Sequence, residues 1–428
     1  MIKKINIKDV LKYILKAVLV WIAVMALVLI FMTLVSCIRR DSILGQKIVS
    51  NVEESMYVWS EDIESPMLHN AKWYQIGNGD DMMLANMAIT DVDGNAFYRA
   101  MTLHYYWAPD DETGFNGLVE AMYYPDSTNI NEYSRFYMMI GSAMKLMFIV
   151  YDIVEIRMML YFITSILSTI IIYLLHRELG WRGVIPFVTA CTLRLIIAHG
   201  MTFNAFSDIL IGFVGMLIVL LNYKKKWFRD NELIIFGVIG MIAYINCMLY
   251  APLFTLGMPL VTTVLLEETH SDRSVRSWLK IFADSVCWVV GYGSALVAKI
   301  VISRVVQGYQ TASDEMTYMM GLDMSLSERF AMIKYVIDGI FEPYNVKMPL
   351  LIALVVVLAV LLIRNGFMLH RSLGQILVLS LYPFVWIMII CRHSQHNLVA
   401  NIMCMWIFAL VSAICLSIGD KKSSSTEE

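Results

Sequence analysis

Long apolar runs recur along most of this 428-residue chain, and they limit its fold more than any other feature. A bilayer core about 30 Å thick requires about 20 predominantly apolar residues in each helix that crosses it. Hydrophobic residues make up 58% of the chain and charged residues 16%, against just under half and about a quarter in soluble domains. We therefore predict an all-α fold, a polytopic transmembrane helical bundle. About ten spans are expected, at residues 17–35, 154–175, 183–200, 205–222, 233–249, 253–266, 281–305, 350–362, 373–391 and 398–418.

The distribution of lysine and arginine predicts how these spans are oriented. Lys3, Lys4, Lys8, Lys12 and Lys16 precede the first apolar run, and the positive-inside rule places such residues in the cytoplasm. Basic clusters farther along the chain fit an alternating path through the bilayer. We therefore expect both termini to be cytoplasmic.

This path divides the chain into four parts. They are an N-terminal cytoplasmic segment with the first span (1–36), a long extracytoplasmic loop with an interfacial helix (37–152), a transmembrane bundle with a second outer loop at 307–347 (153–418), and a disordered cytoplasmic tail (419–428). Helices are expected near 48–60 and 82–90, and an extended segment near 102–107. Ser325 and Glu328 have the spacing of a capping box, which predicts a helix start in the second outer loop.

The cysteines and the net charge argue against several classes of protein. The seven cysteines include no CxxC pair, so neither a disulfide framework nor a zinc site of that type is predicted. The net charge of −3 argues against a nucleic-acid partner. Cys37 ends a Leu-Val-Ser-Cys stretch that is similar to a lipoprotein cleavage box. Because the run before it is long enough to span the bilayer, we favour an uncleaved anchor.

Candidate acidic groups lie in the long outer loop. Asp80 and Asp81 follow a glycine-rich turn that is expected to expose both carboxylates, which suits a general base or a divalent cation site. The alternative is an ordinary acidic turn or a helix N-cap. Residues 91–95 are similar to the start of a calcium loop, but the position of the required glutamate is Thr102, so we interpret them as a turn.

Candidate cationic groups lie at the outer side of the expected spans. Arg135, between Tyr133 and Tyr137, has a planar guanidinium that can clamp a phosphate while the rings pack on a sugar or a lipid; the alternative is interfacial anchoring. Lys299 lies inside an expected span, where a charge is costly and marks a functional site unless it snorkels. At an outer span end, Arg392 is followed by His393 and His396, which suit phosphate contact, proton transfer or simple interfacial polarity. Two histidines alone do not make a metal site.

The order of these features carries a resemblance. It consists of a first span, a long outer loop with an acidic turn, Tyr133-Ser134-Arg135 and an aromatic residue before the second span, Gly291-Tyr292-Gly293 followed by Lys299 in a later span, and an outer His393-Ser394-x-His396 stretch. This order resembles a group of uncharacterised multi-pass membrane proteins of Gram-positive bacteria. Those proteins are similar in turn to the GT-C superfamily of membrane glycosyltransferases.

The resemblance implies a GT-C-like fold in the bacterial cell membrane, a polyprenyl-phosphate-linked sugar as donor, and a cell-envelope glycan or lipid as acceptor. It implies Asp80 or Asp81 as the base, and Arg135, Lys299 and Arg392 as contacts of the donor phosphate. Because the catalytic acid of that superfamily often lies soon after the first span, Asp41 is a third candidate. No cofactor is assigned; a divalent cation at Asp80 and Asp81 is the candidate that the acidic turn suggests.

Two other functions stay open. A flippase or transporter of a lipid-linked sugar predicts a polar path into the cytoplasmic half of the bundle, where the expected spans are apolar, and internal repeats, which we do not find. A non-catalytic membrane scaffold predicts that substitution of Asp80 or Asp81 changes stability alone.

Overall fold

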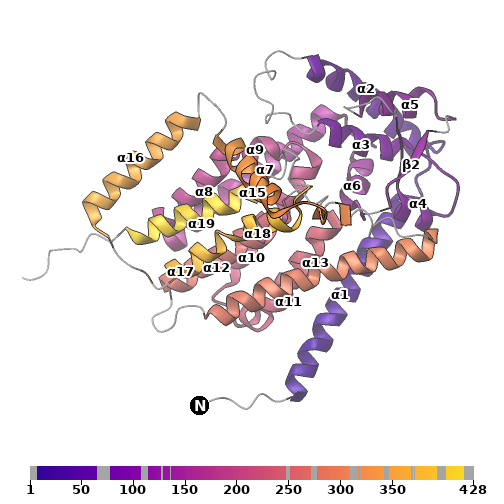
Figure 1. Cartoon of the computed structure of the whole chain (residues 1–428). Coiled ribbons are helices and arrows are strands. Elements are labelled where there is room, and N and C mark those ends of the chain that lie inside the picture. Colours follow the sequence, from indigo (N-terminus) through magenta and orange to yellow (C-terminus); the bar gives the residue numbers. More distant parts are fainter. Residues whose placement is uncertain are drawn as a thin grey trace, which may run out of the picture.

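The computed structural model consists mainly of helices (Figure 1). It describes residues 7–64, 78–107, 114–126, 129–134, 136–246, 251–270, 277–308, 317–318, 320–341, 347–367, 370, 372–392 and 402–418. Within these residues, four helices are long and apolar enough to cross a membrane: α1 (Ile7–Val35), α7 (Ile153–Leu179), α10 (Phe203–Asn222) and α13 (Trp278–Gln307). They indicate a membrane protein with a helical transmembrane part.

The other six expected spans coincide with helices that are shorter, broken or less apolar. The span at 183–200 is divided into α8 (Trp181–Leu193) and α9 (Ile196–His199), because Leu195 adopts a left-handed conformation with φ of 52°. The span at 373–391 is likewise divided, into α17 (Leu373–Leu379) and α18 (Tyr382–Ile389). The remaining expected spans fall on α11 (Lys226–Asn246), α12 (Pro252–His270), α16 (Lys347–Asn365) and α19 (Ile402–Ser417). A count of ten spans therefore stays a prediction.

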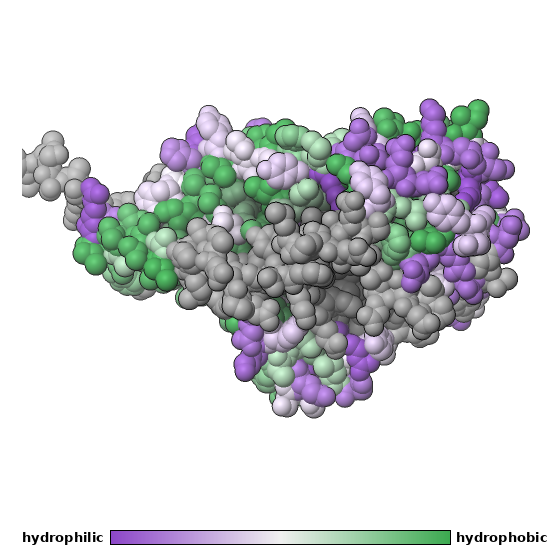
Figure 2. Space-filling model, turned by 90° about the horizontal axis from the view of Figure 1, so that it is seen from above, coloured by the Kyte–Doolittle hydropathy of each residue, from purple (hydrophilic) through white to green (hydrophobic). Residues whose placement is uncertain are grey.

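The residues between α1 and α7 form a compact unit, which we call the outer unit. Its elements are α2 (Ile43–Glu64), α3 (Asn78–Ile89), α4 (Ala96–Thr102), β1 (His104–Tyr106), α5 (Phe115–Tyr123), β2 (Ile130–Glu132) and α6 (Met139–Met147). The strands pair antiparallel with His104 opposite Glu132. The helices expected near 48–60 and 82–90 are confirmed. The extended segment expected at 102–107 is confirmed only at His104–Tyr106, because Thr102 ends α4 and Leu103 has a positive φ of 42°. Figure 2 shows hydrophilic residues gathered over the end of the molecule where Figure 1 places this unit.

The interfacial helix expected within residues 132–150 is shorter than the sequence suggested. Glu132 is the last residue of β2, so the helix cannot begin there. Met138 has a positive φ of 53°, and α6 begins only after it, at Met139. Ile140, Ser142 and Met144 of α6 are buried, and α6 packs on α3 within the outer unit and on α1, α10 and α11. By contrast, α15 (Leu326–Phe341) begins as expected, because Ser325 and Glu328 form the reciprocal hydrogen bonds of a capping box.

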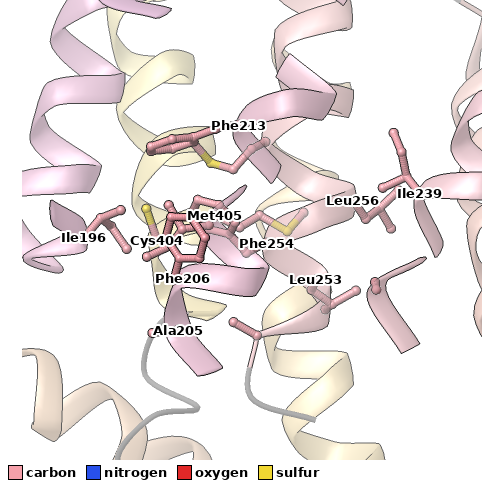
Figure 3. Packing of buried hydrophobic residues seen from close by; sticks show 14 of the residues in the cluster. Ile196, Ala205, Phe206, Phe213, Ile239, Leu253, Phe254, Leu256, Cys404 and Met405 are labelled. Carbon is pink, nitrogen blue, oxygen red and sulfur yellow. The ribbon is translucent and has the colours of Figure 1, made fainter. Parts of the chain in front are cut away.

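The core of the bundle lies between α10, α12 and α19. Figure 3 shows Phe206 and Phe213 of α10 facing Phe254 of α12, with Met405 of α19 beside them. A methyl group at Gly212 would overlap the ring of Phe254, so the absence of a side chain sets the approach of α10 to α12. Small residues that allow close helix approach are typical of membrane bundles, where packing replaces the hydrophobic effect between helices.

Candidate functional site

The acidic turn of the outer loop is packed against the bundle. Asp81 lies in the first turn of α3 and is fully buried. Its Oδ2 lies 3.3 Å from Nη2 of Arg157 on α7, and its Oδ1 accepts a hydrogen bond of 3.1 Å from the backbone N–H of Phe203 at the start of α10. The expectation that both carboxylates are exposed is wrong for Asp81, because the glycine-rich turn continues into a helix whose first turn meets α7 and α10. Asp80, one residue earlier, is partly exposed.

Burial sets the acidity of Asp81. Removal from water disfavours the charged form, and this effect outweighs the attraction of the Arg157 guanidinium and the hydrogen bond from Phe203. The neighbouring charge of Asp80 acts in the same direction as burial. Together these effects raise the pKa of Asp81 to about 6. A raised pKa with a specific cationic partner is found at functional sites and also in buried ion pairs that only hold a structure together.

A polar side chain follows Phe203 directly. The Oδ1 and Nδ2 atoms of Asn204 are buried and form no hydrogen bond within the described part of the chain. Leaving a buried polar group without a partner costs about 1–3 kcal/mol. Asn204 therefore offers one acceptor and two donors to a polar molecule that reaches the start of α10.

Lys299 joins the outer unit to α13. Its side chain is fully buried, its Nζ donates a hydrogen bond of 2.7 Å to the carbonyl oxygen of Met101 on α4, and the same Nζ lies 5.1 Å from the ring centroid of Tyr137. One turn along α13, the Ser303 hydroxyl donates to the carbonyl oxygen of Ser134. The Lys299 ammonium is thus held inside the protein and does not snorkel to the membrane surface.

The aromatic residues of the predicted site pack as one cluster. Tyr133 and Tyr137 are both buried. Tyr133 packs on Phe136, and both Phe136 and Tyr137 pack on Tyr244 of α11 with ring centroids 6.2 Å apart. The hydroxyl group of Tyr137 makes no hydrogen bond among the residues that the structure describes. Arg135 lies outside the described residues.

The remaining predicted site residues make their contacts elsewhere. Asp41 is exposed and lines a shallow polar depression with Arg39, Arg40 and Asp91. Arg392 forms an ion pair with Asp323, and its guanidinium lies 4.6 Å from the ring centroid of Tyr318, which lies in the segment expected to be the second outer loop. His393 and His396 lie outside the described residues. No cluster of three or more metal-ligating side chains occurs in the described part, so no cation site is assigned.

A small polar cavity lies near the outer end of α1. Its volume is about 50 Å³, and Arg99, His104 and Lys145 are among the residues that line it. The guanidinium of Arg99 donates to the carbonyl oxygen of Ser36, whereas the Lys145 amine makes no hydrogen bond or ion pair with the residues described. Burial lowers the pKa of Lys145 to about 8; Arg99 and Arg39 act in the same direction, and Asp91 opposes them.

Sequence reasoning missed Arg157, Asn204 and Lys145 as site residues. Arg157 could have been found from the sequence, because it lies near the start of the span expected at 154–175. An ionisable residue in a span is a functional candidate by default. Asn204 and Lys145 carry no such signal, since their significance depends on burial. No protein-family model, curated protein or solved structure matches the chain.

Proposed function

We propose that this protein is an outward-facing membrane glycosyltransferase that uses a polyprenyl-phosphate-linked sugar to modify a cell-envelope glycan or lipid in bacteria. One observation carries the proposal: the buried Asp81 carboxylate lies beside Arg157 and the start of α10, at the junction between the outer unit and the bundle. A sugar donor anchored in the bilayer and an acceptor outside it would meet at such a junction.

The chemistry required of this site is simple. The carboxylate takes the proton of the acceptor hydroxyl as the hydroxyl oxygen attacks the anomeric carbon, the bond between that carbon and the phosphate oxygen breaks, and polyprenyl phosphate leaves. A general base works best when its pKa is near the working pH, and a pKa of about 6 suits that role. Arg157 would stabilise the phosphate charge that develops. Asp80, which is partly exposed, is the second candidate for the base.

A non-catalytic scaffold is the second candidate function. It is favoured by the contacts of Arg157, Lys299 and Ser303, each of which joins a bundle helix to the outer unit. On this interpretation the buried charges fix the position of the outer unit and perform no chemistry. Both functions predict damage when the groups are removed, so stability and turnover have to be measured together.

The test uses the full-length protein in lipid nanodiscs with a polyprenyl-phosphate sugar and an envelope acceptor. The variants are Asp81→Asn and Asp80→Asn, with Asp93→Asn as a matched control because Asp93 is an exposed acid of the same unit. Loss of a general base costs at least about 100-fold in rate. We expect that loss for Asp81→Asn when the rate is expressed per folded molecule, because breaking the ion pair with Arg157 also lowers stability, and no loss for Asp93→Asn. Unchanged envelope sugar both in cells carrying Asp81→Asn and in cells carrying Asp80→Asn would rule out the enzyme and support the scaffold.

A further inference from the structure

A largely apolar groove of about 310 Å³ lies between α1, α11 and α13. Its walls include Tyr13 and Ala17 of α1, Val238 and Met241 of α11, and Cys287 and Val290 of α13. Because α1 and α13 are both long and apolar enough to cross a membrane, the groove lies at the depth of the bilayer hydrocarbon. Because its walls are apolar and it lies at that depth, we expect hydrocarbon chains, and not water, to fill the groove.

Side-chain hydrogen bonds join α1 to the bundle at different heights along this groove. Toward the N-terminus of α1, Lys16 Nζ donates a hydrogen bond of 2.5 Å to Oδ1 of Asn231 on α11. More than one turn later, Trp21 Nε1 donates a hydrogen bond of 2.7 Å to the hydroxyl of Ser294 on α13. The first contact fixes α1 against α11 and the second fixes it against α13, so the groove between the three helices is a built feature of the fold.

Basic residues gather at the N-terminal end of the groove. Lys8, Lys12 and Lys16 recur every four residues and so share one face of α1. Lys226 and Arg229 lie in the first turn of α11, where Asp230 pairs with Lys226 and offsets part of the charge. Lysine and arginine clusters beside a transmembrane helix attract anionic lipid head groups, with about 1 kcal/mol for each residue near the surface.

We propose that this groove holds one acyl chain of an anionic glycerophospholipid, whose phosphate head group lies against Lys12 and Lys16. The chain fills the apolar space between α1 and the bundle, and the head group occupies the basic end. The lipid so bound fixes α1, and through its outer end the outer unit, relative to α11 and α13. This inference concerns a structural lipid and does not rest on the proposed function.

The first experiment measures lipid retention. The full-length protein is reconstituted in vesicles of equal phosphatidylcholine and phosphatidylglycerol, extracted in detergent and studied by native mass spectrometry. We expect one retained phosphatidylglycerol per chain. Ala17→Trp, which fills the groove, should abolish retention, whereas Leu19→Trp, on the exposed side of α1, should not. Each of Lys12→Gln and Lys16→Gln should lower the preference for the anionic lipid about fivefold, whereas Lys47→Gln in the outer unit should leave it unchanged.

A second measurement needs no substitution. Phosphatidylglycerol with a photoactivatable acyl chain is cross-linked to the wild-type protein in vesicles, and the labelled peptides are identified. We expect labels concentrated in residues 13–21, 233–241 and 287–294, with competition by unlabelled phosphatidylglycerol. Labels spread evenly over all lipid-facing helices, including α16, would overturn the proposal. So would retention of phosphatidylcholine alone, or of a polyprenyl phosphate in place of the phospholipid.

Discussion

The carboxylate of Asp81 lies 3.3 Å from the guanidinium of Arg157, and this contact joins the outer unit to the first helix of the bundle. Both side chains are buried, so neither charge is compensated by water. Removing one member of such a pair leaves the other charge alone in a low dielectric, whereas replacing both with apolar groups is often tolerated. The loss of stability caused by substituting one of these residues should therefore depend strongly on whether the other residue is still present.

Asp81→Ala and Arg157→Met should each destabilise the protein by about 3–5 kcal/mol, and the double variant by clearly less than the sum. Thermal or denaturant unfolding of the four proteins in one detergent measures this coupling. The control cycle is Lys226→Ala with Asp230→Ala, an exposed pair on α11 whose coupling should be about 0.3–0.5 kcal/mol. Additive effects of Asp81→Ala and Arg157→Met would show that the two charges act independently.

The raised pKa of Asp81 predicts a pH-dependent stability. The folded protein holds a proton on this carboxyl up to a pH of about 6, whereas the unfolded chain releases it near the ordinary pKa of 3.8. The folded state thus binds more protons between these values, so the contribution of Asp81 to stability falls as the pH rises from about 4 to about 6 and is constant above. The total change is up to about 3 kcal/mol.

Asp81→Asn removes this titration and is the control for it. The unfolding free energies of wild type and Asp81→Asn are compared from pH 4 to pH 7. As the pH rises, that of the wild type should fall relative to that of Asp81→Asn. A difference that stays flat, or that rises in favour of the wild type, would mean that the carboxyl keeps an ordinary or lowered pKa in the folded protein.

Much of the fold was predictable because it depends on local patterns. Apolar runs of sufficient length predict α1, α7, α10 and α13, and the Ser325–Glu328 spacing predicts the start of α15. The break at Leu195 was not predictable, since its left-handed backbone depends on how α8 and α9 pack. The sequence also placed Asp81 and Lys299 among the site candidates, but their surroundings depend on contacts with Arg157 and Met101, 76 and 198 residues away.

The contact between α11 and α13 depends on a glycine. A methyl group at Gly291 would overlap the carbonyl oxygen of Gly237, whereas one at Gly293, two residues along the same helix, would meet nothing within 4 Å. Gly291→Ala should therefore destabilise the protein by about 1–3 kcal/mol through forced separation of the helices. Gly293→Ala should be neutral or slightly stabilising, because alanine has the higher helix propensity. Equal midpoints for the two variants would contradict this close approach.

Lys145 should be an unusually reactive amine. With a pKa of about 8, a larger fraction of this amine is neutral and nucleophilic at neutral pH than for lysines with the ordinary value of 10.5. Competitive acetylation followed by peptide mass spectrometry should show labelling of Lys145 rising with pH around 8. Lys47, exposed on α2, serves as the reference.

The same shift predicts a cost to stability. The folded protein binds the Lys145 proton less tightly than the unfolded chain does. The charged amine therefore lowers the unfolding free energy most below a pH of about 8, and this cost disappears as the pH rises toward 10.5. Lys145→Met removes a partly buried charge and should raise the unfolding free energy at pH 7 by roughly 1–3 kcal/mol. A stabilised variant would indicate that this lysine is retained for binding in its cavity, as stability is commonly given up at functional sites. A destabilised variant would instead make Lys145 a structural residue.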